Sequence, residues 1–279
     1  MAIATLDQYL AATKQRIAWW KQTSVTTALA GCGESTFGTA GQPGAGTLAG
    51  AATGSSTPIM PTDATPGCPI IAFSSGTGYL TRVEISNSVA GRVAIYDMLS
   101  KSGAYAYNSG TSTPNPRLDI SSHCPDYSGG GDTAYGINNE IWIEVVTAMT
   151  NAATWQVQVT YYNQAGSLST SVVSVARAAG ALTIGTCFQI GLASGDTGVQ
   201  SIASVIVTTG SATAGTFNVL ILRPLFTCGR VQVVNDGEVF DLVKTGMPVV
   251  YNNSALYVMI APDSTATGLP HIIMEIASA

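Results

Sequence analysis

A run of strict two-residue alternation constrains the fold more than any other stretch of this sequence. Between residues 154 and 162 every second side chain is apolar, and the side chains between them are polar. The apolar row is Trp155, Val157, Val159 and Tyr161, and the other row is Gln156, Gln158, Thr160 and Tyr162. Successive side chains of a β-strand point to opposite faces, so this pattern predicts a strand with one buried and one polar face.

The neighbouring segments extend this strand into a small sheet. Residues 140–149 are largely apolar on both rows, as in a strand that is covered on two sides. Turn residues follow at 163–166, and Gly166 is available for a positive φ, so 167–175 is predicted to fold back as a hairpin. Three consecutive antiparallel strands are the least that hold β-structure in water. We therefore expect residues 140–177 to form the centre of the fold.

Strand signals continue on both sides of this centre. Residues 79–86 and 92–99 predict a second hairpin around a turn at 89–91, and 107–137 predicts a long polar loop. Further short strands are predicted at 187–192, 199–208, 216–222, 230–234, 238–243, 256–260 and 272–276. About a dozen short strands with turn residues between them are typical of a mainly β protein with an antiparallel β-sandwich or jelly-roll-like body.

The first quarter of the chain has a different character. Thr5 and Gln8 have the spacing of a capping box and Asp7 suits the first helical turn, so an α-helix is predicted from Thr5 to Gln22. Residues 31–69 are dominated by Gly, Ala, Thr, Ser and Pro, which predicts an extended Gly-rich arm. The predicted organisation is residues 1–69 as helix plus arm and residues 70–279 as the β-sandwich body, with room for two packed β subdomains.

A lone amphipathic helix ahead of a β-body must bury its apolar face, either on that body or on a neighbouring subunit. Aromatic anchors are enriched at protein interfaces, and two tryptophans are adjacent here. The candidate interface residues are Leu6, Tyr9, Leu10, Ile17, Trp19 and Trp20.

Charge is scarce. Only 10% of residues are charged, against about 25% in ordinary globular domains. A surface with so few charges is poorly protected against self-association, which favours a chain that is surrounded by other subunits. The net charge of −5 offers no basic footprint, so no nucleic-acid partner is expected. No apolar run approaches the ~18 residues of a membrane helix and no secretory signal pattern is present, so we expect cytoplasmic synthesis and no membrane association.

Motifs that carry chemistry are weak. His123 lies near Asp119, Asp126 and Asp132 in the polar loop, but the spacing matches no known set of metal ligands. The pairs Glu140 with Glu144 and Asp236 with Glu238 are the only carboxylates proposed for glycoside cleavage, and Asp236-Gly237 is better explained as a hairpin turn. The five cysteines contain no Cys-x-x-Cys pair and predict isolated buried thiols. We therefore expect no enzyme, no cofactor and no metal.

Two segments resemble a known family. The N-terminal sequence from Ala2 to Gln15 is similar to that of a family of tailed-bacteriophage virion proteins, and residues 159–166 resemble a β-hairpin of the same proteins. Together they cover less than a tenth of the chain. The resemblance implies a structural protein of the phage head, of the capsid decoration or cement type. Such proteins sit on the capsid lattice, often as dimers or trimers, and contact the major capsid protein.

The leading hypothesis is accordingly a non-enzymatic cement protein that resides on the capsid surface of a virion after synthesis in the host cytoplasm. Its expected partners are the major capsid protein and other copies of itself, as a dimer or trimer. The alternative is a receptor- or carbohydrate-binding module of a tail or fibre, for which exposed tyrosines are the candidates: Tyr105, Tyr107, Tyr127 and Tyr135. A capsule depolymerase is a third, weaker hypothesis.

Overall fold

The computed structural model describes residues 3–29, 32–47, 57–73, 77–108, 110–114, 116–150, 154–210 and 214–278, except for the side chain of Cys228. The described chain is mainly antiparallel β-structure, which confirms the predicted fold class. It divides into two compact units. Unit 1 comprises Met1–Thr47, Pro61–Asp97 and Pro224–Ala279, and unit 2 comprises Leu48–Met60 and Met98–Arg223.

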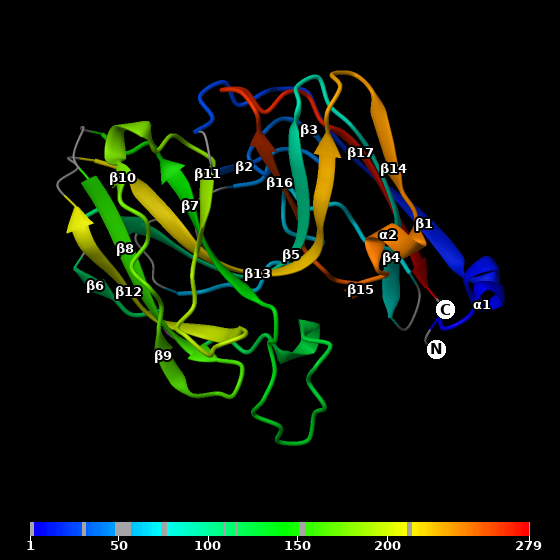
Figure 1. The fold of residues 1–279 in the computed structure, drawn as a ribbon. Coiled ribbons are helices and arrows are strands. Elements are labelled where there is room, and N and C mark those ends of the chain that lie inside the picture. The colour runs from blue at the N-terminus through cyan, green and yellow to red at the C-terminus, as the bar shows by residue number, and fades with distance from the viewer. Residues whose placement is uncertain are drawn as a thin grey trace. The chain divides into compact units, whose positions relative to one another are not determined.

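Unit 1 is built on a six-stranded sheet in the order β14-β4-β17-β1-β3, with β15 paired to β4 (Figure 1). Its strands are β1 (Thr13–Lys21), β3 (Gly41–Gln42), β4 (Gly78–Ser86), β14 (Gly237–Phe240), β15 (Val249–Val250) and β17 (His271–Ser278). A second ladder joins β2 (Gly33–Ser35), β16 (Leu256–Pro262) and β5 (Gly91–Ala106). Two short helices, α1 (Leu6–Ala11) and α2 (Leu242–Thr245), belong to the same unit.

The core of unit 1 lies between these two ladders. Trp19 of β1 is fully buried, and its indole Nε1 donates a hydrogen bond to Thr36 Oγ1, just beyond β2, at 3.0 Å. Phe37 packs against Tyr257 of β16 with ring centroids 5.9 Å apart. Apolar rows from two facing layers therefore close a sandwich core.

Unit 2 has a five-stranded sheet in the order β10-β8-β12-β6, with β9 paired to β8. Its strands are β6 (Thr111–Ser112), β8 (Thr154–Asn163), β9 (Leu168–Thr170), β10 (Arg177–Ala178) and β12 (Val199–Gly210). A second ladder places β7 (Glu140–Thr147) between β11 (Thr186–Ile190) and β13 (Thr216–Val231), and two 3-10 turns are η1 (Ser121–His123) and η2 (Ala179–Ala181). Trp155 of β8 joins the two layers, 4.9 Å from the Phe217 ring and 6.2 Å from the Phe188 ring.

The alternating stretch behaves as predicted. All four side chains of its apolar row are buried, whereas those of its polar row are half-exposed. The following turn is confirmed as well, because Gly166 has φ 74° and its N–H donates to the carbonyl of Asn163. A hairpin then returns the chain as β9.

The predicted pairing of the central strands is wrong. β7 and β8 belong to different ladders, since β7 pairs with β11 and β13 while β8 pairs with β9, β10 and β12. The predicted hairpin of 79–86 with 92–99 fails in the same way, because β4 pairs with β17 and β5 with β16. Both connections pass from one layer to the other, so β7 and β8, and likewise β4 and β5, are consecutive in the sequence but do not pair in a sheet.

The predicted helix from Thr5 to Gln22 is also wrong beyond its first turns. The capping box of Thr5 and Gln8 is present, but α1 ends at Ala11 and the extended Ala12 leads into β1. Strand β1 pairs along its length with β17. Its burial pattern has a period of two, with Ile17, Trp19 and Lys21 inward, and this ladder outweighs the local helix propensity.

The predicted Gly-rich arm contains more structure than expected. Strands β2 and β3 lie within it, and Cys32, Phe37 and Cys68 are buried in unit 1. Residues 48–56 of this stretch lie outside the described residues. The four cysteines whose side chains are described, Cys32, Cys68, Cys124 and Cys187, are buried thiols, as predicted.

Candidate functional site

The outward face of the unit 1 sheet is the surface on which most of the predicted interface residues can be located. Along β1 the outward side chains are Arg16, Ala18 and Trp20, and their partners on β17 are Glu275, Ile273 and His271. On β4 the same rows continue with Arg82, Glu84 and Ser86. This face therefore changes from charged rows near α1 to a row of aromatic and small side chains at the other end.

At the charged end, α1 presents two leucines to solvent. The helix has no buried residue, and Leu6 and Leu10 are 64% and 65% exposed. Their i, i+4 spacing places them on one side of the helix. Besides the capping box, the Lys14 ammonium donates to the carbonyl of Tyr9 at 2.9 Å, which satisfies one of the last carbonyls of the helix. Local polar contacts thus hold a very short helix whose apolar side chains remain uncovered.

Glu275 anchors this helix to its own sheet. The carboxylate accepts hydrogen bonds from the Tyr9 hydroxyl at 3.0 Å and from the Thr81 hydroxyl at 3.1 Å. Arg16 Nε lies 3.8 Å from its other oxygen. Burial and the hydrogen bond to Glu275 raise the pKa of Tyr9, so the phenol stays protonated and keeps donating at neutral pH. Tyr9 therefore faces the sheet while the leucines do not.

The six predicted interface residues separate into two groups. Leu6, Leu10 and Trp20 are exposed, and Tyr9 is half-buried on the side of α1 that faces the sheet. Ile17 and Trp19 are in the core of unit 1, so neither of these two candidates presents a surface for an interface. The reason is the change of period: a helix would have put Ile17 and Trp20 on one face, whereas the strand points Ile17 inward and Trp20 outward.

The inward row of β1 ends in a buried lysine. Lys21 is 2% exposed, and its ammonium donates to the carbonyls of Thr39 at 3.2 Å and Pro43 at 2.8 Å. It also lies 4.6 Å from the centroid of the Trp19 ring. Burial lowers the pKa of Lys21 from 10.5 to about 8. This residue fastens the segment around β3 to β1.

The far end of the outward face contains a shallow hollow. Trp20 is 41% exposed and stacks on His271, with ring centroids 5.4 Å apart and ring planes 16° from parallel. His271 directly precedes the predicted strand 272–276 and is the first residue of β17. A partner some 250 residues away leaves no local signal, so only the β1–β17 register reveals this pair.

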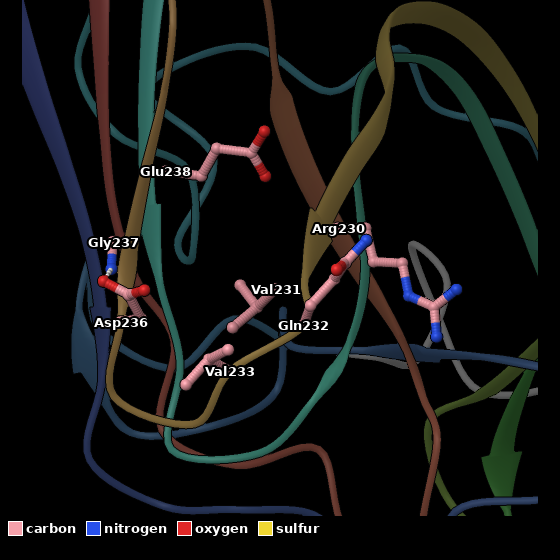
Figure 2. Close-up of a pocket in the computed structure, with 7 residues that line it drawn as sticks. All are labelled: Arg230, Val231, Gln232, Val233, Asp236, Gly237 and Glu238. Atoms are coloured by element: carbon pink, nitrogen blue, oxygen red, sulfur yellow. Dashed lines mark hydrogen bonds between the residues drawn. The ribbon is translucent and has the colours of Figure 1, made fainter.

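A second hollow, of about 310 Å³, is lined by residues 230–233 and 236–238 (Figure 2). The predicted turn is shifted here, because Asn235 takes φ 62° and the Asp236 N–H donates to the carbonyl of Val233. The Asp236 carboxylate accepts from the Gly237 N–H at 2.8 Å, whereas Glu238 projects away from it (Figure 2). The two carboxylates do not converge as a catalytic pair requires.

The other carboxylate pair is also unsuited to glycoside cleavage. Glu140 and Glu144 are four residues apart on β7, which separates them by about 13 Å along the strand, beyond the ~5–9.5 Å of such enzymes. Glu140 accepts from the Trp142 indole at 2.7 Å, and burial raises its pKa. Glu144 is fully buried and accepts from the Asn218 amide at 2.9 Å. Both groups have structural partners.

The tyrosines predicted as an exposed cluster are not exposed together. Tyr105 is in the core against Phe217, and Tyr135 is buried. Tyr127 meets Tyr135 edge-on at 5.5 Å. Tyr107 is half-buried. Burial together with the charge of Asp119 raises the pKa of Tyr135 to about 12.

The polar loop keeps its histidine inside. His123 is buried in η1. The Ser121 N–H donates to Asp119, and the Ser128 hydroxyl and the Ala134 N–H donate to Asp132; these hydrogen bonds lower the pKa of both carboxyls. Among the described residues, no three side chains of His, Cys, Asp or Glu gather as metal ligands would. The described helices are likewise all too short or too polar to cross a bilayer.

Comparison with known proteins gives little. No family model matches the chain, and no curated protein matches its sequence. Two solved structures of infectious bursal disease virus cover 95% of this chain, the Gx strain at 12% identity over 80% of its chain and the Gt strain at 9% over 81%. Both have a TM-score of 0.16, which supports neither a shared fold nor a function.

Proposed function

We propose that this chain is a non-enzymatic structural protein of a tailed-phage virion, a capsid cement or decoration protein that binds the major capsid protein and copies of itself. The observation that carries the proposal is helix α1, which exposes Leu6 and Leu10 although the fold of unit 1 provides a sheet face beside it. An isolated helix of this length is marginal in water, so a stable one that displays two leucines is suited to a partner that covers them.

Burying one leucine side chain contributes about 1.5–3 kcal/mol, and two at i, i+4 fit a shallow groove on a partner. The Glu275 carboxylate on the sheet face already accepts a hydrogen bond from the Tyr9 hydroxyl and lies 3.8 Å from Arg16 Nε. A partner can therefore cover the leucines without having to desolvate an isolated charge.

Unit 2 adds a second apolar surface. Four apolar side chains along residues 168–175 are exposed: Leu168 by 63%, Val172 by 52%, Val173 by 42% and Val175 by 72%. Two apolar surfaces, one in each unit, suit a protein with two kinds of neighbour, the capsid lattice and other copies of itself. The low charge of the whole chain, 10%, agrees with a surface that is largely covered in an assembly.

The copy number per particle tests this proposal. Quantitative mass spectrometry of purified virions should find hundreds of copies, in a fixed ratio to the major capsid protein. A handful of copies per particle would instead place the chain in a tail or fibre, and its absence from purified virions would exclude a structural role in the particle.

A second measurement addresses the stabilising role. Heads assembled without this chain should lose their DNA at a lower temperature than complete heads, and adding the purified protein should restore the difference. Equal heat resistance with and without the chain would contradict a cement function.

A further inference from the structure

The hollow at the Trp20 end of the unit 1 sheet has the features of a small binding site. It has a volume of about 300 Å³ and lies on the outward face of β1, β17, β4 and β14, which run side by side in Figure 1. The six residue steps from Lys14 to Trp20 span about 20 Å of strand, so the hollow is separate from the leucines of α1.

Its aromatic wall is held in place before any ligand arrives. Trp20 and His271 are directly opposite each other in the β1–β17 ladder, and their rings stack. Each ring restricts the rotation of the other, so little side-chain entropy remains to be lost on binding. A large aromatic surface that is 41% exposed on a rigid strand is therefore a preorganised platform.

The hollow exists because the next two positions in the same row are small. His271 is paired with Ser86 of β4, and Ser86 is paired with Gly237 of β14. A Cβ atom added to Gly237 would meet only the carbonyl oxygen of Ile85, at 3.9 Å. The space above Gly237 is open, and it can be filled by a side chain without backbone strain.

The neighbouring row supplies a mixture of apolar and polar groups. Glu84 lies between Ile273 and Val239 across the sheet. Arg82 lies 3.0 Å from the Glu84 carboxylate and offsets its charge. The hollow thus offers a fixed hydrogen-bond acceptor, the Ser86 hydroxyl as donor or acceptor, and aliphatic side chains around them.

We propose that this hollow binds one neutral hexopyranose ring of a saccharide. The C–H face of a pyranose packs on the electron-rich face of an aromatic ring, and its hydroxyl groups need acceptors and donors at the rim. Two carboxylates line the hollow, Glu84 and Glu238, and they supply acceptors for sugar hydroxyl groups. An acidic sugar is disfavoured by these two carboxylates, and a purely apolar ligand would cover them without donating a hydrogen bond to either.

This activity goes beyond a role in the capsid and does not depend on it. The test is a titration of the full-length chain with maltohexaose, cellohexaose and chitohexaose, followed by tryptophan fluorescence and calorimetry. Trp19 and Trp155 are fully buried and Trp142 is a half-buried residue of unit 2, so Trp20 is the tryptophan whose emission a ligand in this hollow changes most. We expect saturable binding of at least one of the three, with a dissociation constant in the millimolar range.

Three variants assign the binding to this hollow. Trp20→Ala should weaken it at least about tenfold, and Gly237→Leu should abolish it while Trp20 remains. Gly110→Leu is the matched control, because a Cβ there meets nothing within 4 Å and the position is in unit 2. Its binding should equal that of the wild type. No saturable signal with any of the three saccharides would overturn the proposal, and so would binding by Trp20→Ala and Gly237→Leu that equals that of the wild type.

Discussion

Two adjacent tryptophans have opposite environments in this protein. Trp19 is fully buried in the core of unit 1 and hydrogen-bonds Thr36, whereas Trp20 is 41% exposed and stacks on His271. The residue type and the strand are the same, so only the direction of the side chain differs. The difference separates two roles on one strand: the inward face stabilises the fold, and the outward face is available for contacts.

The largest expected effect is on the inward side. Trp19→Ala removes a fully buried indole together with its hydrogen bond to Thr36 and leaves a cavity, so we expect a loss of about 3–5 kcal/mol in the free energy of unfolding. Urea denaturation measures it. A loss below about 1 kcal/mol would contradict the difference between Trp19 and Trp20, because it would mean that the inward face of β1 is not part of the core.

The next effect depends on pH and concerns Lys21, on the same inward face. Its pKa is lowered from 10.5 to about 8 by burial, so between these values the unfolded chain binds more protons than the folded one. Stability from this group is therefore gained as pH rises from 8 to 10.5, by at most about 1.4 kcal/mol per pH unit. Below pH 8 both states are protonated and the slope vanishes.

Lys21→Met supplies the control. Methionine keeps the length and apolar stem of the side chain but cannot titrate, so the stability of this variant should lack the rise that the wild type gains in this pH window. Chemical denaturation at pH 7, 9 and 10 compares the two chains. Parallel pH profiles would show that Lys21 titrates normally and is not desolvated as its burial implies.

Unit 2 offers the same comparison within one short segment. Ser171 and Ser174 point inward, where their hydroxyls accept the N–H groups of Val159 and Val157 at 3.0 Å, while Val175 points outward. Ser171→Ala and Ser174→Ala each leave a buried N–H of β8 unsatisfied and should cost about 1–3 kcal/mol. Val175→Ser should change stability by less than about 0.5 kcal/mol. Amide hydrogen exchange at Val157 and Val159 would detect the loss directly.

The smallest effect is expected at Trp20. Trp20→Ala should alter the free energy of unfolding by less than about 0.5 kcal/mol, because the lost contact with His271 is on the surface. Thermal unfolding of this variant beside Trp19→Ala sharpens the comparison. If both variants lost the same stability, the outward face would be part of the core and not a surface for binding.

The local sequence pattern predicted those elements that depend on neighbouring residues and on which side chains face water. The alternation at 154–162, the turn ending at Gly166 and the capping box of Thr5 with Gln8 were all predictable. Residues 13–21 were not, because a strand in that segment is stabilised by its ladder with β17, which a reading of neighbouring residues cannot include. The amphipathic pattern that predicted a helix over residues 5–22 was therefore weaker evidence than this ladder.

The contact surfaces were predictable only in part. Of the predicted interface candidates, Leu6, Leu10 and Trp20 are exposed, whereas Ile17 and Trp19 are buried in the core of unit 1. The hollow beside Trp20 could not be foreseen, since it is formed by Glu84, Ser86, Gly237 and His271 from three other strands. The small size of Ser86 and Gly237 has meaning only once the strand register is known.

A capsid-binding assay tests whether the exposed leucines of α1 attach this chain to the capsid. Purified wild-type protein and the double variant Leu6→Ser/Leu10→Ser should be mixed with heads assembled without this chain and sedimented, with Val243→Ser as a control for an exposed residue of unit 1 on α2. We predict saturable binding of the wild type and of the control, and loss of binding by the double variant. Failure of the wild type to bind heads, or equal binding by all three chains, would contradict the account.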